Sequence, residues 1–65
     1  MKISVNGEAQ VTTAETLADL LTDLDQGNTK VATAVNEVFV AAATRANCKL
    51  EPGDRVEIVA PRQGG

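Results

Sequence analysis

Four leucines on one helical face mark the segment Thr16-Leu17-Ala18-Asp19-Leu20-Leu21-Thr22-Asp23-Leu24. They stand at positions i, i+3, i+4 and i+7, which is the spacing that gives an α-helix one apolar side. We expect Thr13 to be the N-cap, Glu15 to lie in the first turn and Gly27 to follow the last turn as a C-cap glycine. The pattern therefore predicts a helix of about three turns.

The opposite side of this predicted helix is acidic. Glu15, Asp19 and Asp23 are spaced four residues apart and therefore fall on one side. Like charges at this spacing destabilise a helix by about a few tenths of a kcal/mol per pair. Two interpretations are open for this row, a solvated surface and a docking surface for a basic partner.

Short runs of alternating polar and apolar residues around the helix predict β-strands. Near the N-terminus, two such runs at 2–5 and 9–11 flank Asn6-Gly7, a dipeptide that tolerates the positive φ angles of a type I′ hairpin turn. After the helix, further strands are predicted at 31–35, 38–40 and 55–59. The turn before the last strand, Glu51-Pro52-Gly53-Asp54, has proline and glycine where a type II turn requires them.

The apolar side of the helix should cover one face of the sheet. The strand residues expected beneath it are Ile3, Val5, Val56 and Ile58. Phe39, the single aromatic residue, is expected in the core because large apolar side chains are usually buried. Small residues on one side of 31–35 are consistent with a helix lying close to the sheet. The alanine-rich stretch 41–46 predicts a helical turn, and Cys48 is interpreted as a small packing residue.

Length, charge and composition exclude several classes of function. Sixty-five residues form one small domain that buries only about 60% of its unfolded surface, which leaves little room for a complete enzyme active site. A net charge of −3, scattered basic residues and the absence of Tyr and Trp argue against a nucleic-acid partner. Histidine is absent, so a zinc site is not expected. No apolar run approaches the ~20 residues of a transmembrane helix, and the single cysteine fits a reducing cytoplasm.

The last six residues, Ala60-Pro61-Arg62-Gln63-Gly64-Gly65, follow the final predicted strand directly. Pro61 cannot donate to a sheet ladder, so we expect a folded domain at 1–60 and a flexible diglycine tail at 61–65. Two glycines without side chains suit a segment that enters a narrow pocket and presents its terminal carboxylate there. A frayed terminus is the other interpretation.

The order of hairpin, helix and returning strands before a diglycine end resembles the α+β ubiquitin-like β-grasp fold. That fold is a mixed sheet of four to five strands with one main helix packed across it. Four segments resemble the ThiS family of thiamine-pathway sulfur carrier proteins, namely Met1–Glu8, Thr16–Leu21, Val31–Asn36 and Pro52–Val59 with Gly64-Gly65. None of these segments is specific alone, but their combination is. One segment departs, because many members have a Val-Pro-Arg-Ser type sequence and a tryptophan where this chain has Ala41-Ala42-Ala43-Thr44.

The resemblance implies a carrier protein and not an enzyme. In the family, an adenylating, E1-like enzyme activates the C-terminal carboxylate with ATP and magnesium. Sulfur from a persulfide then replaces the adenylate, and thiazole synthase uses the resulting thiocarboxylate as its sulfur source. Carried over to this chain, Gly65 is the site of adenylation and sulfur attachment, and Gly64 gives the tail access to the partner's active site. The chain itself then needs no cofactor.

Three other functions share parts of this pattern. The small subunit of molybdopterin synthase uses the same tail chemistry, but its members are usually longer and Asn6-Gly7-Glu8 fits the thiamine carriers better. A ubiquitin-like modifier would be joined through Gly65 to lysines of target proteins. A pure interaction domain would carry its glycines incidentally. A free thiocarboxylate is expected of the carriers, and lysine adducts are expected of the modifier.

Overall fold

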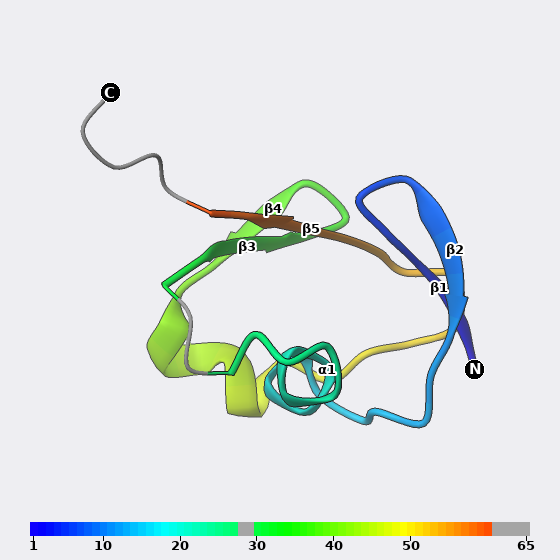
Figure 1. The fold of residues 1–65 in the computed structure, drawn as a ribbon, viewed down its shortest axis with the longest axis horizontal. Helices are drawn as coiled ribbons and strands as arrows, with labels where there is room; N and C mark the ends of the chain where they lie inside the picture. Colours follow the sequence, from blue (N-terminus) through cyan, green and yellow to red (C-terminus); the bar gives the residue numbers. More distant parts are fainter. Residues whose placement is uncertain (28–29, 61–65) are drawn as a thin grey trace.

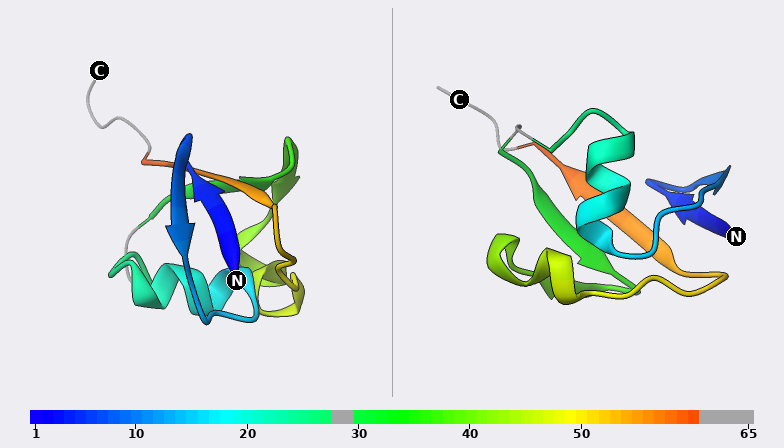
Figure 2. Two further views of the ribbon diagram at one scale, coloured as in Figure 1. Left: turned by 90° about the vertical axis from the view of Figure 1, so that its right-hand side faces the viewer. Right: turned by 90° about the horizontal axis from the view of Figure 1, so that it is seen from below.

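The computed structural model describes residues 1–27 and 30–60, which form a sheet curved over a helical layer (Figure 1). The elements in chain order are β1 (Lys2–Val5), β2 (Glu8–Val11), α1 (Leu17–Asp23), β3 (Ala32–Val35), β4 (Val38–Val40), the 3₁₀-helix η1 (Ala42–Asn47) and β5 (Arg55–Val59). The strands form one mixed sheet in the order β2-β1-β5-β3-β4, and α1 packs across one face of it (Figure 2). The predicted α+β architecture, with one main helix on a mixed sheet, is confirmed. No helix within these residues is long and apolar enough to cross a membrane.

β5 lies at the centre of the sheet, between two hairpins. It runs parallel to β1 and antiparallel to β3, so the last strand joins hairpin β1–β2 to hairpin β3–β4. Each hairpin closes with a two-residue turn in which both residues have positive φ, as a type I′ turn requires. The predicted turn has φ of 51° at Asn6 and 85° at Gly7. The second turn has φ of 51° at Asn36 and 72° at Glu37, a left-handed conformation that strains a non-glycine residue.

α1 begins later in the chain than the sequence pattern predicts. Thr16 is the N-cap, because its backbone is extended and its Oγ1 accepts a hydrogen bond from the Asp19 N–H at 3.1 Å. Thr16 also forms an antiparallel bridge with Lys49, which keeps the residues before it out of the helix. The predicted roles of Thr13 as N-cap and Glu15 as a first-turn residue were therefore wrong.

α1 ends in a Schellman motif built on an aspartate instead of a glycine. Asp25 has a φ of 65°, its N–H donates to Thr22 O at 3.1 Å, and the Gln26 N–H donates to Leu21 O at 2.7 Å. Gly27 lies two residues beyond Asp25, so its predicted role as the C-cap glycine was wrong. With 7 residues, the helix has about two turns in place of the predicted three.

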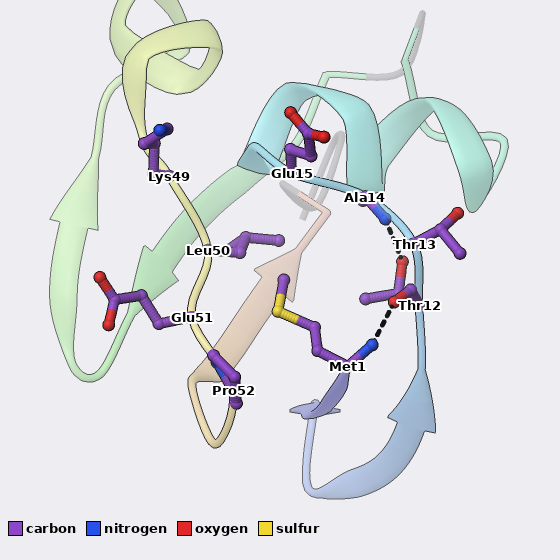
Figure 3. A pocket seen from close by; sticks show the side chains of 9 residues that line it. All are labelled: Met1, Thr12, Thr13, Ala14, Glu15, Lys49, Leu50, Glu51 and Pro52. Carbon is purple, nitrogen blue, oxygen red and sulfur yellow. Dashed lines mark hydrogen bonds between the residues drawn. The ribbon is translucent and has the colours of Figure 1, made fainter.

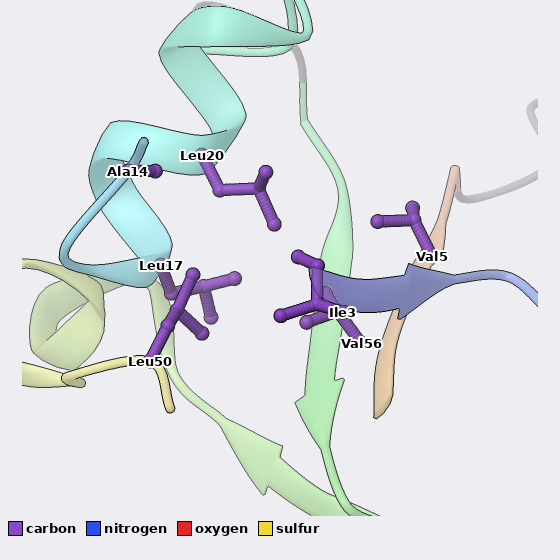
Figure 4. Packing of buried hydrophobic residues seen from close by; sticks show 7 residues of the cluster. All are labelled: Ile3, Val5, Ala14, Leu17, Leu20, Leu50 and Val56. Atoms are coloured by element: carbon purple, nitrogen blue, oxygen red, sulfur yellow. The ribbon is translucent and has the colours of Figure 1, made fainter. Parts of the chain in front are cut away.

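The core lies between α1 and the sheet, where Leu17 and Leu20 point from the helix towards Ile3 (Figure 4). Its buried residues are Ile3, Val5, Ala14, Leu17, Leu20, Leu50 and Val56. Leu21 is buried as well, and Leu24 and Ile58 are partly buried. The predicted packing of the helix on the sheet is confirmed. Ala14 and Leu50 were missed because both lie in connecting segments, outside any periodic pattern.

The helical turn predicted in the alanine-rich segment is present as η1. Arg45 fastens η1 to β3 and to the residue before it, because its Nε donates to Thr33 Oγ1 at 3.0 Å and its Nη2 donates to Val31 O at 2.5 Å. Cys48, which follows η1, is a free thiol partly buried against the core. Its predicted role as a small packing residue is confirmed.

Candidate functional site

The described part of the chain ends at Ala60, directly after β5. The predicted site residues Gly64 and Gly65, and the predicted tail at 61–65, lie outside the described residues. The part of the site that can be described is the end of the central strand, which we call the tail root and define as Ile58, Val59 and Ala60. Figure 1 shows this end of β5 on the side of the molecule far from the N-terminus.

The tail root is held from both sides. On one side, β3 pairs with β5 as far as Val59, the last residue of β5, which lies opposite Ala32. On the other side, the pairing between β1 and β5 stops at Val56, and the Asn6 side chain continues it. The Asn6 Oδ1 accepts a hydrogen bond from the Ile58 N–H at 2.8 Å, and its Nδ2 donates to Ile58 O at 3.1 Å. A side-chain amide therefore provides the donor and the acceptor that a neighbouring strand would supply.

The sheet face turned away from α1 carries apolar residues beside the tail root. Ala34 lies opposite Phe39 in the β3–β4 pair, and Ala32 lies opposite Val59 in the β3–β5 pair. Phe39 is 70% exposed and Val59 is 61% exposed. Phe39 and Val59 lie on β4 and β5 with the small Ala32 and Ala34 of β3 between them, and the exposed Glu57 opposite Ala34 borders them. Exposed large apolar side chains on one face are typical of an interaction surface. We call Ala32, Ala34, Phe39 and Val59 the open-face patch.

The prediction that Phe39 lies in the core was wrong. Val40 pairs with the buried Thr33 and so shares the face that α1 covers, and strand alternation then turns Phe39 outward. Ala32 and Ala34 lie on the same outer face, so the interpretation that small residues of β3 face the helix was also wrong. In a strand of three apolar residues, alternation alone does not tell which face is buried.

The predicted acidic row is shorter in the structure. Asp19 and Asp23 are exposed on α1, whereas Glu15 precedes the helix. These two carboxylates lie on the helical layer and are therefore on the opposite side of the sheet from the open-face patch. The two interpretations of the row, solvation and docking, stay predictions.

A surface hollow of about 450 Å³ lies beside Met1 (Figure 3). Its lining residues are Met1, Thr12, Thr13, Ala14, Glu15, Lys49, Leu50, Glu51 and Pro52. The Met1 ammonium donates to Thr12 O at 2.7 Å, and Thr12 Oγ1 accepts from the Ala14 N–H at 3.0 Å. Within residues 1–27 and 30–60, no buried side-chain N or O lacks a hydrogen-bond partner, and no three potential metal-ligating residues cluster. We assign no ligand to this hollow.

Sequence and structure comparisons relate the chain to known proteins. The model of the ThiS family matches residues 3–65. Among solved structures, the chain is similar to the crystal structure of thiamine biosynthesis protein ThiS from Geobacter metallireducens, with 25% identity, 100% of each chain covered and a TM-score of 0.84. No curated protein sequence matches the chain. The family match includes the strands of the open-face patch and extends to Gly64 and Gly65.

Proposed function

Because the chain belongs to the ThiS family, we propose that it is a thiamine-pathway sulfur carrier in which Gly65 is adenylated and converted to a thiocarboxylate. The thiocarboxylate donates its sulfur for thiazole formation. The observation that carries this proposal is the family match, which runs from residue 3 through the diglycine at the end. The similar solved structure, named as a thiamine biosynthesis protein, supports the same pathway.

In the proposed reaction, the Gly65 carboxylate is ionised at neutral pH and attacks the α-phosphate of ATP, which releases pyrophosphate. The terminal sulfur of a persulfide then attacks the acyl carbon, and AMP leaves. A thiol then attacks the donor's sulfur in the acyl disulfide so formed, which joins thiol and donor as a disulfide and leaves a thiocarboxylate on Gly65. An adenylating, E1-like enzyme binds the ATP and magnesium, so the carrier needs no cofactor and is not itself an enzyme.

Two protein partners act on the carrier in this scheme, the adenylating enzyme and thiazole synthase. Both must reach Gly65, so we place docking of the adenylating enzyme on the surface beside the tail root. The open-face patch meets this condition, because Val59 belongs both to the patch and to the tail root. Asp19 and Asp23 lie on the other side of the sheet and are less well placed. The cytoplasm, expected from the single thiol, is the compartment that we propose.

The direct test of the proposed function is the intact mass of the protein. The chain is incubated with the thiamine-pathway adenylating enzyme, ATP, magnesium, a persulfide donor and a thiol, and a sample without ATP is the control. The expected product has one oxygen replaced by one sulfur. A wild-type chain that never gains this sulfur contradicts the carrier function, and lysine adducts in cells would indicate a protein modifier instead.

Phe39→Ser is expected to weaken docking to the adenylating enzyme without destabilising the fold. Phe39 is 70% exposed, so the folded chain loses little buried area on its truncation. Truncation of a central aromatic residue of an interface costs about 2 kcal/mol or more, so the Kd should rise roughly 30-fold or more. Titration calorimetry at fixed salt measures the Kd, and a thermal melt checks the fold.

Val11→Ser is the matched control for this prediction. Val11 is 79% exposed, but it lies on β2, which β1 separates from β5. Its Kd should stay within about twofold of wild type, as for most surface substitutions. Equal losses of affinity in the two variants, or an unchanged Kd for Phe39→Ser, would place the docking surface elsewhere.

A further inference from the structure

Two asparagines occupy equivalent positions in the two hairpins, and both bond to β5. Asn6 and Asn36 are each the first residue of a type I′ turn, and each has a φ of 51°. The Asn6 carboxamide bonds to Ile58 near the end of β5, whereas the Asn36 Oδ1 accepts from the Arg55 N–H at 3.0 Å at its beginning. One asparagine therefore holds the end of β5 that leads to the tail, and the other holds the opposite end.

The Asn6 carboxamide extends the hydrogen-bond ladder between β1 and β5 beyond the point where the backbone of β1 turns away. On the β1 side of β5, Asp54 O accepts from the Ser4 N–H at 3.0 Å and Val56 O accepts from the Asn6 N–H at 2.9 Å. The next residue of β5 on this side is Ile58, but the backbone after Asn6 has turned into the hairpin. The Asn6 side chain supplies both missing bonds, at 2.8 and 3.1 Å. β5 is therefore held on this side beyond its last backbone pair with β1.

We propose that Asn6 is a positioning residue for the sulfur transfer, an inference that rests on the proposed function of Gly65. By holding Ile58 against the N-terminal hairpin, Asn6 sets the direction in which β5 presents the residues that follow to the adenylating enzyme. Gly65 lies seven residues beyond Ile58, and seven residues drawn out in an enzyme channel span up to about 25 Å. A segment drawn out to this length has no slack, so a displacement of Ile58 away from the hairpin is passed on to its far end.

The kinetic consequence of this role differs from that of a docking residue. A misplacement of ~1 Å at a reacting group can cost about a hundredfold in rate, so loss of Asn6 should lower kcat. Asn6 bonds to no residue of the open-face patch, and Val59 keeps its pairing with Ala32 of β3, so KM should change little. A fall in kcat at constant KM separates lost positioning from lost binding.

Three variants separate the effect of the Asn6 carboxamide from that of the turn. Asn6→Gly removes it and keeps a residue that adopts positive φ without strain, so the turn is preserved. Asn36→Gly is the matched control, because it removes the same group from the same turn position at the other end of β5. Asn6→Asp keeps an acceptor for the Ile58 N–H and loses the donor to Ile58 O, so it should behave as an intermediate case.

Two measurements are made on the wild-type chain and the three variants. Amide hydrogen exchange at Ile58 reports the hydrogen bond between the Ile58 N–H and Asn6. The exchange rate should rise on the order of tenfold in Asn6→Gly and stay at the wild-type value in Asn36→Gly. Steady-state kinetics of thiocarboxylate formation should show kcat on the order of tenfold lower for Asn6→Gly, with KM within about twofold. The kcat of Asn6→Asp should fall less, and that of Asn36→Gly should equal the wild-type value.

Equal kcat values for Asn6→Gly and Asn36→Gly overturn the positioning role of Asn6. A rise in KM alone, or unchanged exchange at Ile58 in Asn6→Gly, overturns it as well. A wild-type chain that gains no sulfur overturns the proposed function and this inference with it. That outcome is distinguishable, because hydrogen exchange reports the hold on Ile58 without any activity of the carrier.

Discussion

A chain that lacks Gly65 is expected to fold normally and to gain no sulfur. The deletion moves the terminal carboxylate back by roughly 3.3–3.6 Å of chain, far more than the ~1 Å misplacement that can cost about a hundredfold in rate. All buried core residues fall within the sequence range from Ile3 to Val56, so deletion of Gly65 removes no core contact. The melting temperature should therefore stay close to that of the wild-type protein. Intact mass after incubation with the adenylating enzyme, ATP and a persulfide donor measures the gain, and pyrophosphate exchange measures the activation step.

Two further tail variants separate chain length from side-chain volume. One residue added after Gly65 keeps a terminal carboxylate but lengthens the chain and brings a side chain to the reacting end. Gly64→Val keeps the length and places a β-branched side chain next to the proposed reacting residue, where it also restricts φ and ψ. Both should strongly reduce pyrophosphate exchange and sulfur gain. A Gly65 deletion that gains sulfur at the wild-type rate would show that Gly65 is not the carrier residue.

Leu20→Ala is expected to remove a large share of the stability of the fold. Leu20 is 1% exposed and lies in the core cluster between α1 and the sheet. Truncation of a buried leucine to alanine costs about 2–5 kcal/mol. A domain of 65 residues has an unfolding free energy of roughly 3–10 kcal/mol in total, at about 0.05–0.15 kcal/mol per residue. Urea denaturation followed by circular dichroism measures the loss.

Leu24→Ala is the matched control for the core. Leu24 is only partly buried and forms the C-cap of α1, so its truncation should lower the denaturation midpoint by less than that of Leu20. If Leu20→Ala unfolded at the wild-type midpoint, the packing of α1 on the sheet would not be the main source of stability.

Local patterns in the sequence predicted the elements whose signals lie within a few residues. The Asn6-Gly7 turn and the leucine face of α1 depend on spacing along the chain, and both are confirmed by the structure. The ends of α1 were not predictable in this way. Thr16 replaces Thr13 as N-cap because of its bridge to Lys49, a residue far along the sequence.

The geometry beside the tail depends on long-range strand pairing, which local patterns do not contain. Phe39 faces outward because Val40 pairs with Thr33, and the three apolar residues of β4 are compatible with either face. The Asn6 carboxamide meets Ile58, 52 residues later, because β1 and β5 are parallel neighbours. The Asn-Gly signal predicts the turn, but the second use of the asparagine side chain depends on which strand lies beside it.

The central place of β5 makes completion of the sheet depend on a strand that follows all the others in the described chain. β1 and β3 do not pair with each other, and each pairs with β5, which follows both in the chain. A chain emerges N-terminus first, and contacts between distant segments form only after the cost of closing the loop between them is met. Without residues 55–59, the two hairpins have no common neighbour and the sheet under the leucine face of α1 is incomplete. A chain that stops before β5 lacks the middle of its sheet, so its two hairpins have no strand to join them.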